Sequence, residues 1–94
     1  MLDLDLTLSV DAIQDIDQAV EYYNGLSLGL GFEFADTIDR YFVKIQRLPS
    51  ASAIRYDQVR VKPVDTFPFT IHYTIADTQI IILRVFNTYQ KQVR

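Results

Sequence analysis

The chain begins with an alternation of apolar and polar residues. Leu2, Leu4, Leu6 and Leu8 alternate with Asp3, Asp5 and Thr7. A period of two is typical of a β-strand with one apolar face, so we predict a strand over about residues 2 to 8.

A helical spacing follows directly. Ser9 is suited to cap a helix N-terminus, and apolar residues then recur every three or four positions, at Ile13, Ile16, Val20 and Tyr23. This pattern predicts an amphipathic helix that ends near Asn24–Gly25, because glycine tolerates the left-handed conformation found at helix ends.

A second helical stripe runs up to Pro49. After a link containing Gly29 and Gly31, its apolar positions are Phe34, Ile38, Tyr41, Ile45 and Leu48. Two helices joined by a short link form an antiparallel hairpin, whose apolar side needs a sheet to cover it. Residues 50 to 57 are expected to be a loop.

Alternation returns in the last third of the chain. Strands are predicted over residues 59 to 62, 69 to 75 and 79 to 87, with Pro63 and Pro68 limiting them. The last run is apolar on both faces, so we place it centrally. The chain is thus predicted to be one α+β domain, residues 1–94 in the order βααβββ, with the helical hairpin packed on one face of a small, mostly antiparallel sheet.

Strand alternation also predicts which residues face away from the hairpin. The face covered by the hairpin is assigned the even-numbered leucines of the first strand and these residues of the later strands: Val59, Val61, Phe69, Ile71, Tyr73, Ile75, Ile81, Leu83 and Val85. The opposite parity points outward: Asp3, Asp5, Arg60, Lys62, Thr70, His72, Thr74, Ile80, Ile82, Arg84 and Phe86. A face that mixes cations with isoleucine and phenylalanine is expected to be covered by a partner.

Composition removes several classes of function. The 94 residues, 49% hydrophobic and 22% charged, are enough for one globular core. With no cysteine and a single histidine, we expect neither a metal site nor a cofactor. No apolar run is long enough to span a bilayer and the N-terminus lacks a basic start, so a cytoplasmic location and no membrane contact are expected.

The charges are unevenly distributed. Residues 1 to 39 hold nine acidic side chains and no Lys or Arg, whereas residues 40 to 94 hold nine basic and three acidic ones, a net charge of +6. Any contact with nucleic acid therefore falls to the second part of the chain, while the first part repels phosphate and attracts a basic partner.

The sequence resembles the RelE/ParE superfamily of bacterial toxins over about residues 2 to 89. The resemblance is carried by a Ser-capped helix ending in Glu21-Tyr22-Tyr23, by Gly29-Leu30-Gly31 and Leu48-Pro49 around the second helix, by the basic segment VRVKPV, and by FPFTIHYTI and IIILRVF. It implies a toxin of a type II toxin–antitoxin module, held by a cognate antitoxin.

The resemblance implies two modes of action. RelE-like members cleave ribosome-bound mRNA without a metal, and ParE-like members bind and inhibit DNA gyrase. Fold does not choose between them, because function depends on the site. The acidic pI of 4.8 favours protein binding or a weakened nuclease. A degenerate, non-toxic module that binds only its antitoxin is the third possibility.

In the nuclease interpretation, Arg60, Lys62 and Arg84 would bind the RNA phosphate and Tyr89 would assist proton transfer. These positions come from the resemblance and from their predicted shared face. Asn87 stands where several relatives have histidine, and Gln90-Lys91 replaces an arginine often present there. Ion pairing of the three cations with Asp3 and Asp5 is the simpler alternative.

Partner binding is predicted at Ile80, Ile82 and Phe86, the apolar part of the outward face. His72 is expected to be structural or to contact the partner, because a lone histidine seldom forms a catalytic site without oriented neighbours.

Overall fold

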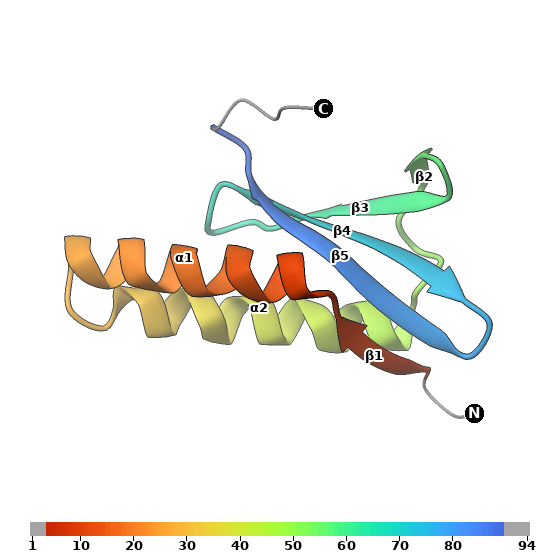
Figure 1. Ribbon diagram of the computed structural model, residues 1–94, viewed down its shortest axis with the longest axis horizontal. Coiled ribbons are helices and arrows are strands. Elements are labelled where there is room, and N and C mark those ends of the chain that lie inside the picture. Colours follow the sequence, from red (N-terminus) through yellow and green to blue (C-terminus); the bar gives the residue numbers. More distant parts are fainter. Residues whose placement is uncertain (1–3, 90–94) are drawn as a thin grey trace.

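The computed structural model describes residues 4–89. Its elements run β1 (Asp5–Leu8), α1 (Val10–Leu26), α2 (Leu30–Arg47), β2 (Ile54–Tyr56), β3 (Val59–Pro63), β4 (Phe69–Ala76) and β5 (Gln79–Asn87). The predicted α+β architecture is confirmed, with β2 as an additional strand (Figure 1). The predicted positions Leu2 and Asp3 lie outside the described residues.

The five strands form one sheet in the order β1-β5-β4-β3-β2. β1 pairs in parallel with β5, and the other neighbours are antiparallel. The predicted central place of the last strand is therefore confirmed, although β1 accompanies it only from Gln79 to Ile82.

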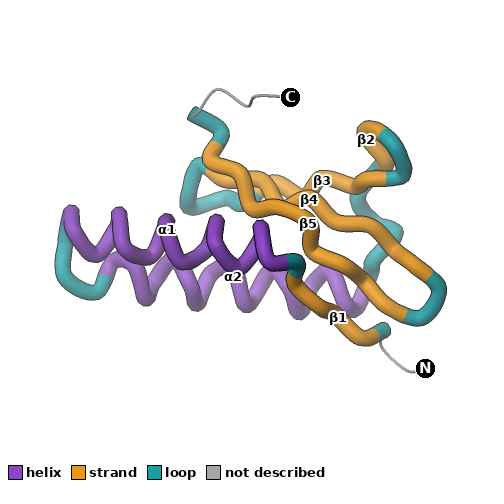
Figure 2. The backbone as a smooth tube through the Cα atoms, in the orientation of Figure 1, coloured by secondary structure: helices purple, strands orange, loops and turns teal. Residues whose placement is uncertain are grey.

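The two helices form an antiparallel hairpin along one side of the sheet (Figure 2). Ser9 caps α1 as predicted, accepting the Ala12 N–H at 3.0 Å. The helix continues through Gly25, and the left-handed residue is Gly29, with φ of 89°, at the start of α2. A side chain on Gly31 would collide with the Val20 carbonyl, so glycine there permits the close approach of the helices.

The core fills the space between the hairpin and the sheet. Its largest fully buried side chains are Phe34 and Ile38 from α2, Ile71 and Tyr73 from β4, and Ile80 and Ile82 from β5. The Phe67 ring, in the β3–β4 connection, contacts Tyr23 of α1 and Phe34 of α2 edge to face, with centroid distances of 5.1 and 5.2 Å. The loop end of the hairpin extends past the sheet (Figure 1).

Strand β2 lies where a loop was predicted. It is joined to β3 by Asp57 and Gln58, both with positive φ, at 44° and 66°. Such a pair makes the two-residue hairpin turn that matches strand twist, but Asn-Gly or Asp-Gly is its usual sequence. Because glutamine is rare in this conformation, the turn could not be predicted from the local sequence.

The predicted outward position of Ile80 and Ile82 is wrong. His72 pairs with Arg84 but Tyr73 pairs with Ile82, so Leu83 is an extra residue, a β-bulge. A one-residue insertion exchanges the faces of all side chains beyond it. Ile80 and Ile82 consequently share the core face with Val85, whereas Ile81, assigned to the core, pairs with Thr74 on the outer face.

The predicted faces of β3 are also reversed. Arg60 lies opposite Tyr73 and Lys62 opposite Ile71, both core residues, while Val61 lies opposite His72. Directly paired residues share a face. Lys and Arg tolerate the helix side because their aliphatic stems can pack while their charged ends find polar partners, as Arg60 does at the Ser52 carbonyl.

Candidate functional site

The four residues predicted to cleave RNA do not lie together. Arg60 and Lys62 belong to the helix side of the sheet, and Arg84 to the opposite side with His72. Tyr89 follows β5 and is 86% exposed. The predicted common surface of three cations is therefore wrong, because the parity of β3 and the bulge in β5 separate them.

Arg60 is hydrogen-bonded to the backbone of the connection between α2 and β2. Its Nη1 donates to the Ser52 carbonyl at 2.7 Å and to the Ser50 carbonyl at 3.4 Å. A guanidinium that binds two backbone carbonyls holds the connection between α2 and β2 against the sheet. Arg60 therefore stabilises this connection.

Lys62 faces the C-terminal half of α2. Its Nζ lies 5.8 Å from the centroid of the Tyr41 ring, and the Nζ of Lys44 lies 4.5 Å from the same centroid. Two ammonium groups from different elements thus approach one aromatic ring, whose face attracts cations. Both residues line a cavity beside the end of α2.

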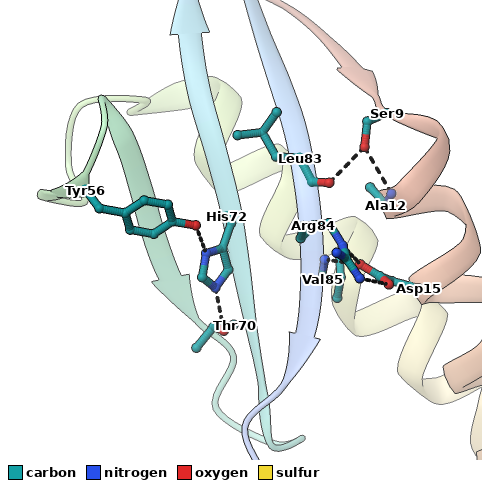
Figure 3. A network of polar contacts seen from close by, with 9 residues as sticks. All are labelled: Ser9, Ala12, Asp15, Tyr56, Thr70, His72, Leu83, Arg84 and Val85. Atoms are coloured by element: carbon teal, nitrogen blue, oxygen red, sulfur yellow. Dashed lines mark hydrogen bonds and ion pairs between the residues drawn. The ribbon is translucent and has the colours of Figure 1, made fainter. Parts of the chain in front are cut away.

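Arg84 is bound to α1 by a bidentate ion pair (Figure 3). Its Nε lies 2.8 Å from Asp15 Oδ2 and its Nη2 lies 2.9 Å from Oδ1. The hydrogen bond with Asp15 raises the pKa of Arg84. Oδ2 of Asp15 also accepts the Val85 N–H at 2.9 Å. The carboxylate thus provides a hydrogen-bond acceptor for the backbone of β5 beyond the point where β1 ends.

The start of α1 is joined to the same edge. Ser9 donates its backbone N–H to the Ile82 carbonyl at 2.9 Å and its hydroxyl to the Leu83 carbonyl at 2.8 Å (Figure 3). The bulge is thereby held from outside the sheet, by the residue that also caps the helix.

His72 lies on the outer side of the sheet but is only 6% exposed. Its Nδ1 is 2.9 Å from the Tyr56 hydroxyl and its Nε2 is 2.9 Å from the Thr70 hydroxyl (Figure 3). Desolvation, followed by the nearby Arg84 and Arg55, lowers the pKa of His72. The structural interpretation of this histidine fits, since both ring nitrogens are occupied by hydroxyls of the chain itself.

The outer face is thus partly covered by the chain itself. Tyr56 comes from the unpredicted strand β2, and Phe86 packs edge to face on His72 at 4.9 Å while the Arg84 guanidinium lies 4.4 Å from the Phe86 centroid. Sequence reasoning missed Tyr56 because the hairpin that brings it to His72 carries no glycine. Phe86 is partly buried, and its predicted role in partner binding stays a prediction.

The loop end of the hairpin carries four highly exposed apolar or aromatic side chains. They are Leu28 (96% exposed), Phe32 (66%), Leu26 (62%) and Tyr22 (60%). Exposed carboxylates, among them Glu21 and Glu33, lie next to them in the sequence. Sequence reasoning missed this surface; for Leu26 and Leu28 the signal was an apolar link where polar loop residues are usual.

Within residues 4–89, no group of three or more His, Cys, Asp or Glu side chains is arranged to hold a metal ion. No described helix is long and apolar enough to cross a membrane.

Comparison with known proteins identifies the fold. No protein-family model matches the chain, and no curated protein matches it by sequence. Among solved structures, a chain of the chromosomal ParDE toxin–antitoxin system from P. aeruginosa is similar, with a TM-score of 0.79 and 20% identity. The match covers 89% of this chain and 95% of that one. The chain therefore has the same fold as that ParDE chain, in agreement with the predicted α+β architecture.

Proposed function

We propose that this protein is the toxin of a type II toxin–antitoxin module and that it acts by binding a protein target, with DNA gyrase as the first candidate. The similarity to a ParDE chain over nearly the full length of both proteins supports the module. The separation of the four candidate catalytic residues supports binding over RNA cleavage.

The separation of these residues is the observation that favours protein binding over RNA cleavage. A metal-free ribonuclease needs cations and a proton-transfer group around one phosphate. Here Arg60 braces a connection, Arg84 is paired with Asp15, and His72 is enclosed by two hydroxyls. These groups are committed to intramolecular partners, and Arg60 and Arg84 lie on opposite faces of the sheet.

The antitoxin is proposed to cover the loop end of the helical hairpin. Exposed Leu26, Leu28 and Phe32 offer apolar area there, and the exposed carboxylates of the same helices favour a partner that carries Lys or Arg. This replaces the predicted partner surface at Ile80 and Ile82, which are fully buried.

Controlled expression of the chain alone in bacteria tests the mechanism. We expect arrested growth, loss of negative supercoiling in a reporter plasmid, and intact transcripts. Tyr89→Phe is the informative variant, because Tyr89 is 86% exposed and its hydroxyl is the candidate proton-transfer group. Toxicity should be unchanged in Tyr89→Phe.

Cleaved transcripts that become intact in Tyr89→Phe would support the RelE-like mechanism in place of this one. Normal growth with normal supercoiling and intact RNA would support the non-toxic module. In either case a Leu28→Asp variant, which places a charge on the proposed antitoxin surface, tests the antitoxin contact separately through co-purification with the antitoxin.

A further inference from the structure

A feature that the proposed function leaves unexplained is a cavity of about 240 Å³ at the C-terminal end of α2. It lies between the last turn of α2, the connection to β2, and strands β3 and β4. An apolar cavity of about 150 Å³ is enough to hold benzene. This one has room for an aromatic ring and a short side chain.

The walls of the cavity are mostly apolar. Leu48 and Ala51 contribute exposed aliphatic surface, and the buried side chains of Ile45 and Tyr73 lie behind them. The Tyr73 hydroxyl is not free for a ligand, because it donates to the Pro49 carbonyl at 2.7 Å. Burial of apolar ligand surface is therefore the main source of affinity that these walls offer.

The charged lining residues are all cations: Lys44, Arg47 and Lys62. In the described part of the chain the one ion pair joins Arg84 to Asp15, so none of the three is paired with a carboxylate of residues 4–89. Lys44 and Lys62 approach Tyr41 from different elements, and their mutual repulsion would be relieved by an anion placed between them.

The cavity is also held open by contacts of the chain itself. Arg60 binds the carbonyls of Ser50 and Ser52, and Tyr73 binds that of Pro49, so both ends of its outer wall are fixed to the sheet. A preformed site loses less entropy on binding than one that must be ordered by its ligand.

We propose that this cavity binds a small amphipathic carboxylate, with an aromatic or branched apolar body against Leu48 and Ala51 and its carboxylate between Lys44 and Lys62. Arg47 adds positive charge at the mouth. The inference does not depend on toxin activity, because binding is measured on the purified chain.

The test is a titration of the full chain with 3-phenylpropionate, followed by amide and methyl chemical shifts. For a ligand of this size we expect saturable binding with a Kd of about 1 mM or tighter, and shifts that concentrate on residues 44 to 52, 62 and 73. The neutral 3-phenylpropionamide should bind about tenfold more weakly or worse, because it lacks the charge.

Two variants locate the carboxylate. Lys62→Met keeps the aliphatic stem and should weaken binding about fivefold, and Arg47→Gln, at an exposed position, should weaken it less. Arg55→Gln is the matched control, since Arg55 is an exposed cation that does not line the cavity. Thermal unfolding of each variant shows whether the fold is retained.

Several results would overturn the proposal. They are the absence of saturable shifts at about 10 mM 3-phenylpropionate, equal binding of the neutral amide, or equal binding of inorganic phosphate, which cannot use the apolar walls. Binding of a capped acidic peptide with one leucine at these residues, without binding of 3-phenylpropionate, would make the cavity a peptide subsite and overturn it as well.

Discussion

The two halves of β5 are both rich in apolar residues but have different neighbours in the sheet. Residues 79 to 82 run between β1 and β4 and direct Ile80 and Ile82 into the core. Residues 84 to 87, beyond the bulge at Leu83, keep only β4 as a strand neighbour and direct Arg84 to the outer side. On their other edge, α1 replaces β1 through the carboxylate of Asp15.

This difference shows that one extra residue, Leu83, is enough to change which side chains of β5 face the core. Because the side-chain period of a strand is two, the bulge allows Ile80, Ile82 and Val85 to face the core together. Without it, either the isoleucines or the valine would face outward.

The largest expected effect is the difference in stability between losing a core-facing and an outward-facing isoleucine among residues 79 to 82. Ile82→Ala removes a fully buried side chain and should lower the free energy of unfolding by about 2 to 5 kcal/mol. Ile81→Ala is the matched control on the outer face and should cost less than about 1.5 kcal/mol. Urea unfolding of both variants measures the difference, and a reversed order would contradict the register.

The next effect concerns the half after the bulge. Asp15→Ala leaves the Val85 N–H and the Arg84 guanidinium without their partner and should cost about 1.5 to 3 kcal/mol. Asp17→Ala, at an exposed position of the same helix, should change stability by less than about 0.5 kcal/mol. Faster hydrogen exchange of the Val85 amide in Asp15→Ala would locate the loss; equal costs for both variants would refute the role of Asp15.

The smallest effect is the pH dependence contributed by His72. Burial and the neighbouring Arg84 and Arg55 lower the pKa of His72 from its ordinary 6.5, against a smaller opposite effect of Asp15. The unfolded chain then binds the proton more readily, so stability is fully present above pH 6.5 and is lost as the pH falls through the folded pKa.

His72→Gln, which keeps groups able to bond both hydroxyls, should remove this contribution. The measurement is the free energy of unfolding of both proteins between about pH 5 and 8. The gap between wild type and variant should change over the acidic part of that range; a constant gap would show that His72 does not titrate between the two states.

Local patterns were sufficient for most of the fold. The Ser9 cap, the two helices and the alternation in β4 each depend on neighbouring residues, and each was predicted correctly. Within the helical stripes, Ile13 and Leu48 are exposed, contrary to the prediction. The end of α1 was placed two residues early because Gly25 stays helical, and the left-handed role belongs to Gly29. β2 was missed because Asp57–Gln58 lacks the usual turn residues.

The candidate site was less predictable. Arg60, Lys62 and Arg84 were assigned to one surface on parity alone, which assumes unbroken strands and a core face chosen by hydrophobicity. The valines of β3 instead lie on the side of His72, and the cations lie beside α2. Which parity faces the core depends on what the helices and β2 cover, and that is a property of the assembled sheet.

The sequence by itself determined the order of helices and strands, the hairpin, the charge asymmetry and the absence of cysteine chemistry, because each follows from residues close together in the chain or from composition. Only the tertiary structure decided the facing of β3, the bulge at Leu83 and the cavity beside Tyr73. These depend on pairings between distant segments, where a shift of one residue exchanges the two faces and leaves the local pattern unchanged.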